Sequence, residues 1–246
     1  MATGGKKYAE MSNTWFRFKQ FTIHQQAAAM KVGTDGVLLG ALADVHNART
    51  ALDIGTGTGL IALMLKQRNP QLQVTAIDVE KEAVEQATGN AALSPWEVEV
   101  LHVSAQAFAL SGRRFDRIVC NPPYFSSSLK APDAARSLAR HNDNLPFGEL
   151  LAAVDRLLAP DGQCWVILPY DAASEFSEKG MQNALHTTQA VTVVTKPGKA
   201  PKRMVLCLER GPRPLRPETL VIENNEGGYT ERYAALVRPF YLDKTV

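Results

Sequence analysis

Apolar positions along the chain fall into short runs, separated by longer stretches in which apolar residues recur every three or four positions. The short runs predict strands over residues 15–21, 50–54, 73–80, 98–103, 115–120, 163–168, 188–195, 203–208 and 220–223. The longer stretches predict helices over residues 34–42, 61–68, 81–93, 147–158, 171–185 and 230–241. Strands that alternate with helices indicate an α/β fold with a mostly parallel, doubly wound sheet and helices on both faces.

The residues that interrupt these elements indicate the expected domain organisation. Turns are expected at Pro160–Gly162 and Lys196–Gly198, where proline and glycine interrupt the pattern. Residues 1–12 are small, polar and charged, which favours a disordered N-terminus. The remaining residues, 13–246, are expected to form one domain. It would consist of an N-terminal extension (13–48), a core (49–210) and a C-terminal strand and helix (211–246).

The stretch Asn121-Pro122-Pro123-Tyr124 follows a buried strand and is the strongest candidate for chemistry. Two prolines stop a central strand and stiffen the turn. An amide, a fixed carbonyl and an aromatic face suit a planar molecule that carries an exocyclic amine. The Asn121 side-chain oxygen and the Pro122 carbonyl could each accept one N–H, and Tyr124 could stack on the ring. The alternative is a proline-rich turn whose Asn bonds its own backbone.

A second candidate is the glycine-rich turn that follows the strand 50–54. Glycines at 55, 57 and 59 depart from the dinucleotide-binding pattern, whose third glycine would fall at Leu60. The tighter spacing lets backbone approach a compact ligand, and the Asp53 carboxylate favours a ligand with an ammonium group over a pyrophosphate. A purely structural glycine turn is the alternative.

Three further places bear on a cofactor. Asp78 ends the next strand about twenty residues after the turn, where an acid commonly binds ribose hydroxyls. Glu80 is the alternative there, or it caps the following helix. Thr34 or Asp35 is an expected helix N-cap, and this helix start could also form a pocket wall. His102 is expected to be an ordinary strand residue.

Charge and cysteine content narrow the class of protein only slightly. The net charge is +2, but basic residues gather over 196–216 and near the start of the chain. Such clusters are either solvated surface or a polyanion footprint. Cys120, Cys164 and Cys207 lie in apolar runs without CxxC spacing, which indicates buried free thiols and no metal site. No signal peptide or membrane-length apolar run is visible, so we expect a soluble, cytoplasmic protein.

With these motifs in place, the chain resembles the Rossmann-like class I S-adenosylmethionine-dependent methyltransferases. Within them it is similar to the bacterial tRNA(Val) adenine-37 N6-methyltransferase family over about residues 15–246. The resemblance is carried by Asn121–Tyr124, Asp53–Gly59, Phe16–Phe21, Met30–Gly36 and Ser94-Pro95-Trp96. It implies N6-methylation of the adenine 3′ of the anticodon, with S-adenosylmethionine as cofactor, the tRNA anticodon loop as partner and a monomeric enzyme.

The resemblance also implies residue roles. Catalytic roles fall to Asn121, Pro122, Pro123 and Tyr124. Cofactor contacts fall to Lys31, Thr34, Asp35, Asp53, Gly55, Thr56, Gly57, Gly59, Asp78, Val79, Ala105, Gln106 and Asn121. Substrate contacts fall to Tyr124, Phe125, Arg136, Arg140, Lys199, Lys202 and Arg203. Ala105 stands where such enzymes usually carry an Asp for the cofactor adenine, so Ser104, Gln106 or backbone would have to replace it.

Three other functions stay open at this stage. A side-chain amide is also planar and carries NH2, so protein glutamine N5 could be the methyl acceptor. Those enzymes usually have a substantial helical domain before the core, whereas only about fifty residues precede the first core strand here. Methylation of DNA or ribosomal RNA is the second alternative. A cofactor-binding module without catalysis is the third, although Asn121 and Tyr124 favour an enzyme. Residues 126–144 could be disordered or form a lid.

Overall fold

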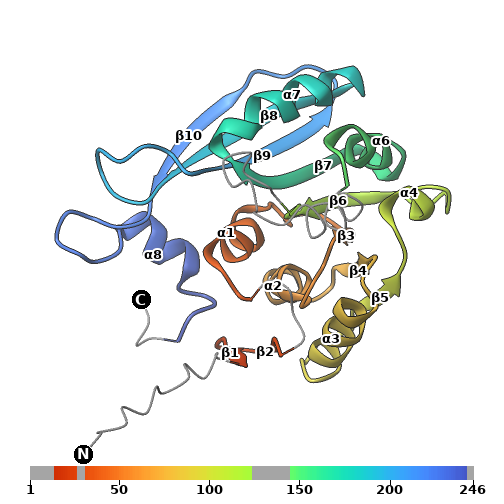
Figure 1. Cartoon of the computed structure of the whole chain (residues 1–246), viewed down its shortest axis with the longest axis horizontal. Helices are drawn as coiled ribbons and strands as arrows, with labels where there is room; N and C mark the ends of the chain where they lie inside the picture. Colours follow the sequence, from red (N-terminus) through yellow and green to blue (C-terminus); the bar gives the residue numbers. More distant parts are fainter. Residues whose placement is uncertain (1–13, 27–30, 124–144, 243–246) are drawn as a thin grey trace, which may run out of the picture.

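One eight-stranded sheet organises the protein in a computed structural model that describes residues 14–26, 31–123 and 145–242. The strand order is β10-β8-β9-β7-β6-β3-β4-β5 (Figure 1). All neighbouring strands pair in parallel, except that β9 runs antiparallel to both β7 and β8. The expected mostly parallel α/β sheet is confirmed.

The strands of the sheet are β3 (Thr50–Ile54), β4 (Gln73–Asp78), β5 (Glu99–His102), β6 (Phe115–Cys120), β7 (Leu158–Pro169), β8 (Leu185–Val194), β9 (Arg203–Arg210) and β10 (Arg216–Val221). The helices are α1 (Thr34–Leu42), α2 (Leu60–Arg68), α3 (Lys81–Ala92), α4 (Ala105–Phe108), α6 (Phe147–Leu157), α7 (Ala173–Gln182) and α8 (Glu231–Val237), with a 3₁₀ turn at Tyr170–Ala172. Apart from the strand expected over 15–21, the predicted elements exist with ends that shift by several residues, and α4 is an additional helix.

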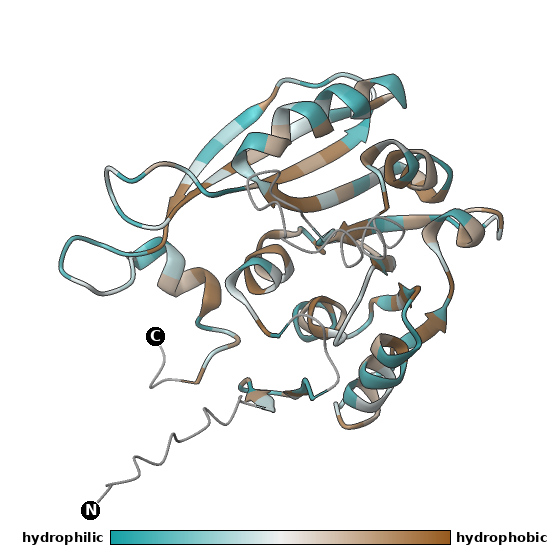
Figure 2. Ribbon diagram, in the orientation of Figure 1, coloured by the Kyte–Doolittle hydropathy of each residue, from teal (hydrophilic) through white to brown (hydrophobic). Residues whose placement is uncertain are grey.

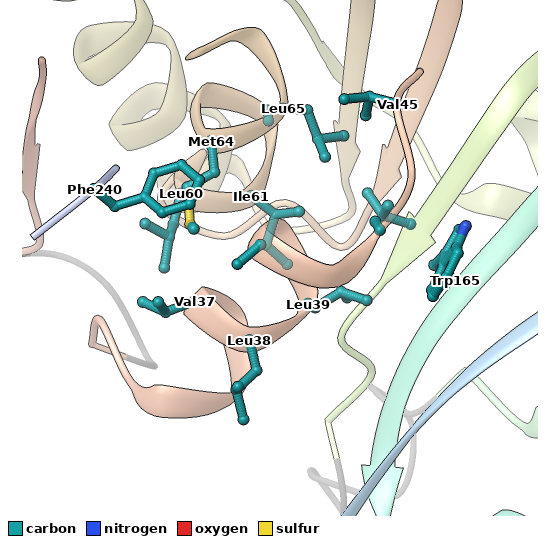
Figure 3. Packing of buried hydrophobic residues seen from close by; sticks show 14 of the residues in the cluster. Val37, Leu38, Leu39, Val45, Leu60, Ile61, Met64, Leu65, Trp165 and Phe240 are labelled. Atoms are coloured by element: carbon teal, nitrogen blue, oxygen red, sulfur yellow. The ribbon is translucent and has the colours of Figure 1, made fainter. Parts of the chain in front are cut away.

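Two hydrophobic clusters lie on opposite faces of the sheet. One joins α1, α2 and α8 to the sheet, and the other joins α4, α6 and α7 to it. Figure 2 shows apolar ribbon on the central strands and hydrophilic ribbon on the outer sides of α3 and α7. Figure 3 shows the first cluster, where Leu60 and Met64 of α2 lie beside Val37 of α1 and Phe240. Helices thus cover both faces, as predicted.

The close approach of α1 and α2 depends on a small residue. A Cβ added to Gly40 would lie 2.8 Å from the Met64 sulfur, and one added to Gly36 would lie 3.0 Å from a Leu60 methyl carbon. Glycine at both positions lets α1 lie against the start of α2. This contact places the beginning of α1 next to the glycine-rich turn.

A small hairpin near the N-terminus packs against the end of the chain. β1 (Trp15–Arg17) pairs antiparallel with β2 (Thr22–His24). The expected single strand over 15–21 is therefore wrong: β1 ends at Arg17, and the chain turns back through Phe18, whose ring stacks on Phe21 and Tyr241. The Lys19 amide also donates to the Phe240 carbonyl.

Two local predictions need correction. Pro160–Gly162 does not form a turn between elements but lies within β7, as a bulge opposite β6. The register moves from Phe115 opposite Leu158 to Arg117 opposite Gln163, which leaves the extra residues of β7 without partners on β6. The N-cap of α1 is Gly33 rather than Thr34 or Asp35, and no side chain caps this helix.

Candidate active site

The glycine-rich turn, Asp78 and Asn121 lie at one edge of the sheet, at the ends of three neighbouring strands. Ile54 of β3 pairs with Ile77 of β4 on one side and with Cys120 of β6 on the other. The next residues along the three strands are Gly55, Asp78 and Asn121, so they leave the sheet at neighbouring positions, with strands about 4.8 Å apart. The chain order also reverses between β3 and β6, which is where ligands of such sheets bind.

The glycine-rich turn forms an open backbone surface. Gly55, Gly57 and Gly59 have φ of +70°, +56° and +80°, in the left-handed region that favours glycine. A Cβ at Gly55 or Gly57 would meet no heavy atom within 4 Å. A Cβ at Gly59 would touch Ala87 of α3 at 3.4 Å. The first two glycines therefore face free space, and the third allows helix α3 to pack against the turn.

Asp53 lies beneath this turn and is fully buried. Its Oδ2 accepts hydrogen bonds from Thr56 Oγ1 at 2.7 Å and from the Ala62 amide at 3.3 Å. Its Oδ1 has no partner among the described residues. Burial raises the pKa of the Asp53 carboxyl to about 7, although the bond from Thr56 opposes the shift. A buried carboxylate oxygen without a partner fits a bound ammonium group.

Asp78 closes the other side of the turn. Its Oδ2 accepts from the Gly57 amide at 2.9 Å, and its Oδ1 accepts from the Glu80 amide at 3.0 Å. Glu80 is the N-cap residue of α3 but makes no side-chain capping bond. Val79, between the two acids, is 51% exposed. An acid next to an exposed apolar side chain fits a nucleoside, because the acid can bind the polar sugar and the apolar side chain can contact the flat base.

The residues that follow β5, where the cofactor adenine is expected, include no acid at the usual position. Ala105 is buried at the start of α4, and Ser104 Oγ caps that helix by accepting from the Ala107 amide. Gln106 donates to Glu149 Oε2 at 2.6 Å. Both polar candidates for replacing the missing Asp already have partners. His102 is a strand residue, as predicted, and its Nε2 lies 2.8 Å from the Val79 carbonyl oxygen.

The residues at the start of α1 meet the basic segment. Asp35 Oδ2 accepts from Arg203 Nε at 2.7 Å, and both side chains are about one-third exposed or less. The pair therefore joins an expected cofactor residue to an expected substrate residue. Lys31 and Thr34 are exposed beside it.

The central turn is described up to its second proline. Asn121 is half-buried, Pro122 is buried and Pro123 is exposed. The Asn121–Pro123 backbone leaves the sheet at the same edge as the glycine-rich turn, because Cys120 pairs with Ile54. Tyr124, Phe125, Arg136 and Arg140, and the stretch 126–144 considered as a lid, lie outside the described residues.

Lys199 and Lys202 belong to the loop that joins β8 to β9. β8 runs parallel to β10 and, across β9, in the same direction as β7. Its carboxyl end, and hence this loop, projects from the same sheet edge as the glycine turn. The loop forms a hollow of about 490 Å³, lined by Thr195, Lys196, Lys199, Ala200, Pro201 and Lys202. The lysines lie at the sheet edge that carries the site, but β7 and β9 separate them from Asn121.

The sequence analysis missed two buried polar residues beside the turn, Gln25 and Asn90. Asn90 was detectable in principle, because it recurs with Ala87 and Ala91 on the buried face of α3. The three cysteines are buried free thiols, as predicted. The described ranges contain no group of three or more potential metal-ligating side chains. They also contain no helix long and apolar enough to cross a membrane.

Comparisons with known proteins agree with this geometry. The methyltransferase small domain model matches residues 27–196. The tRNA1(Val) (adenine(37)-N6)-methyltransferase of Phocaeicola vulgatus is 46% identical over 235 residues, which cover 95% of this chain and 100% of that protein.

Solved structures support the fold. A predicted O-methyltransferase from Agrobacterium tumefaciens superposes with a TM-score of 0.66 at 20% identity, over 84% of this chain and 96% of its own. The 16S rRNA N2 G1207 methyltransferase from T. thermophilus, solved with AdoMet and guanosine, superposes with a TM-score of 0.58 at 19% identity, over 80% and 50%. The fold is that of the class I S-adenosylmethionine-dependent methyltransferases, and by sequence the chain belongs to the tRNA1(Val) (adenine(37)-N6)-methyltransferase family.

Proposed function

We propose that this protein uses S-adenosylmethionine to methylate N6 of adenine 37 in tRNA1(Val). The observation that carries the proposal is the strand register, which aligns Gly55, Asp78 and Asn121 at one edge of the sheet. The name of the relative that is 46% identical supports the choice of tRNA and nucleotide.

We assign the cofactor to the turn between Asp53 and Gly59. The unpartnered Asp53 Oδ1 would accept from the ammonium of the methionine part, and Asp78 would accept from the ribose hydroxyls. Thr56 would hold the Asp53 carboxylate in place, and Val79 would lie against the flat base. When bound, S-adenosylmethionine supplies an electrophilic methyl group on its sulfonium.

The base is assigned to Asn121–Tyr124. The exocyclic amine of adenine is a poor nucleophile because its lone pair is delocalised into the ring. Acceptance of its two N–H groups by Asn121 and the Pro122 carbonyl favours a pyramidal nitrogen whose lone pair faces the methyl group. Stacking on Tyr124 would fix the ring plane, at about 1–3 kcal/mol. The amine loses its proton after the transfer, so no general base is required beforehand.

The proposed substrate does not require the opening of a duplex. A base in an anticodon loop is already unpaired, so its rotation into a pocket costs less than extraction from a helix. We assign Lys199 and Lys202 to the RNA backbone. Arg203 belongs to the same segment, but its guanidinium is paired with Asp35, so we assign it a smaller part. Phe125, Arg136 and Arg140 complete the proposed substrate set. We expect a monomer that acts in the cytoplasm.

Transfer of labelled methyl groups to defined RNAs tests the proposal. The protein is incubated with methyl-labelled S-adenosylmethionine and an unmodified tRNA1(Val) transcript, and in parallel with the same transcript in which adenine 37 is guanine. Label should appear as N6-methyladenine at position 37 of the first RNA and be absent from the second. Equal labelling of both RNAs would exclude adenine 37. Label found only in protein glutamine would favour glutamine N5 methylation instead.

A further inference from the structure

Asn90 of α3 connects two parts of the chain that are far apart in sequence. Its side chain is buried, with 1% exposed. Nδ2 donates to the Thr58 carbonyl at 2.8 Å and to the His24 carbonyl at 2.9 Å. Oδ1 accepts from the His24 amide at 2.9 Å. Both N–H groups and the oxygen of this one amide are thus bonded to backbone.

The first of these backbone groups belongs to the glycine-rich turn. Thr58 lies between Gly57 and Gly59, and the turn rests on α3 through Ala87 as well, one helical turn before Asn90. α3 therefore fixes the position of the turn by packing and by a hydrogen bond.

The second belongs to the N-terminal hairpin and leads to the start of α1. His24 ends β2, and the next side chain, Gln25, accepts from the Val32 amide at 2.7 Å. Val32 precedes Thr34, where α1 begins beside the turn. Through these hydrogen bonds, Asn90 and Gln25 connect the segment before α1 to the glycine-rich turn.

Other roles for Asn90 fit less well. At 1% exposure it cannot touch RNA or a cofactor. Nor is filling space its whole role, because an apolar residue of the same volume would leave three backbone groups of His24 and Thr58 without partners. The hairpin is also held independently by Phe18 and Tyr241, so Asn90 is not its only attachment. What Asn90 alone supplies among the described residues is the direct hydrogen-bonded link from the hairpin to Thr58.

We propose that Asn90 is a positioning residue for the cofactor site: it sets the glycine-rich turn at a fixed distance from the segment that precedes α1. This inference rests on the cofactor part of the proposed function and concerns no step of the methyl transfer. Loss of the amide leaves three backbone groups without partners and lets the two segments move apart. The affinity for the cofactor should fall, whereas RNA binding should be unaffected.

The test measures binding of the reaction product S-adenosylhomocysteine by calorimetry to Asn90→Ala and Asn90→Asp, well below their melting temperatures. Asn90→Asp keeps the size and the acceptor but points an oxygen at two carbonyls. The matched control is Asn69→Ala. The Asn69 amide also bridges two carbonyls, of Val45 and Ala48, but at the far end of α2 from the turn.

Both Asn90 variants should raise the dissociation constant about tenfold or more, because only about a tenth or less of the folded protein would then hold the turn in the binding position. The KM for S-adenosylmethionine should rise in parallel, while kcat at saturation and the KM for tRNA stay within about twofold. Asn69→Ala should lower the melting temperature without changing the dissociation constant. Wild-type affinity in a folded Asn90 variant would overturn the positioning role and leave the proposed function intact. Failure of the wild type to bind the product would instead overturn the proposed function.

Hydrogen exchange of the wild-type protein provides a test that does not depend on a variant's folding. Saturation with S-adenosylhomocysteine should slow exchange in residues 55–60 and, through Asn90, also in residues 22–25. Protection of the turn alone would show that the two segments are not coupled, and would overturn the inference.

Discussion

Asp53 shows how the environment of one side chain sets its chemistry. It is the most buried acid of the site, and desolvation raises the pKa of its carboxyl from 3.8 to about 7. Between about pH 4 and pH 7 the folded protein therefore holds a proton that the unfolded chain has already released. The contribution of this carboxyl to the free energy of unfolding is fully present below about pH 4 and is lost as the pH rises through about 7. A cationic ligand next to Oδ1 would favour the ionised form.

We predict opposite effects of Asp53→Asn on stability and on ligand binding. Without ligand, the variant should gain melting temperature relative to the wild type as the pH is raised from about 5 to about 8, because it carries no buried charge. The wild type should bind S-adenosylhomocysteine more tightly over the same rise in pH, whereas the variant should bind weakly and without pH dependence. Thermal melts and calorimetry at several pH values measure both. A wild-type affinity that does not change with pH would contradict an Asp53–ammonium contact.

Asn121 carries the second residue-scale prediction. Asn121→Ala removes one of two proposed acceptors for the amine while leaving the glycine turn untouched. Turnover should fall by about 10²-fold or more, the scale for loss of one preorganised hydrogen-bonding partner. The dissociation constant for S-adenosylhomocysteine should change little. Single-turnover methylation of tRNA1(Val) is the measurement, and near-normal turnover would exclude the role.

At the scale of elements, the loop between β8 and β9 gathers positive charge at the sheet edge that carries the site. Its lysines lie around one hollow, and its first lysine, Lys196, is already paired with Glu223 at 2.9 Å. Lys199 and Lys202 are the remaining lysines of the hollow. Because Lys196 is paired, we favour Lys199 and Lys202 as the RNA contacts.

Neutralisation of these two lysines should flatten the salt dependence of RNA binding. For Lys199→Gln combined with Lys202→Gln, the slope of log affinity against log salt should fall by about 1–2. Lys179→Gln is the control, since Lys179 lies in the last turn of α7 and that helix leads to the amino end of β8, at the opposite edge. Filter binding at several salt concentrations gives the slopes, and equal slopes for the double variant and the wild type would remove this loop from the footprint.

At the scale of the whole molecule, aromatic rings join the N-terminal hairpin to Tyr241. Phe18 of the N-terminal hairpin, with 1% exposed, lies 4.7 Å from Phe16 and 5.9 Å from Tyr241 between ring centroids. The Lys19 amide bonds the Phe240 carbonyl in the same place. The N-terminal hairpin is thus partly buried by the residues that directly follow α8.

Phe18→Ala should therefore destabilise the protein by about 3–5 kcal/mol, the cost of deleting a buried aromatic ring. Trp15→Ala, in the same hairpin but 49% exposed, should change stability by no more than about 0.5 kcal/mol. Urea unfolding of the two variants gives the comparison. A similar small effect of both substitutions would mean that the two ends fold independently.

The sequence predicted the secondary structure correctly where the local pattern agrees with the tertiary contacts. The strand–turn–helix around Asp53–Gly59 and the strand before Asn121 follow from periodicity and from glycine and proline chemistry. It misled where distant contacts override local signals. Pro160–Gly162 has turn composition, yet β7 pairs with β6 on both sides of it, at Leu158 and at Gln163, so the strand continues through it as a bulge. Gly33, not Thr34 or Asp35, is the N-cap of α1, and Asp35 pairs instead with Arg203, 168 residues away.

The sequence by itself determined which residues could do chemistry: an acid and glycines after one strand, an acid after the next, and an amide between a strand and two prolines. It also determined the sheet class, whereas the division into an extension, a core and a tail stays a prediction. Only the tertiary structure decided that β3, β4 and β6 are neighbours and that Gly55, Asp78 and Asn121 leave them at matching positions, because strand pairing joins positions that periodicity cannot relate. It alone revealed the partnerships of Asn90 and Arg203, since a hydrogen bond or ion pair across the chain leaves no local trace.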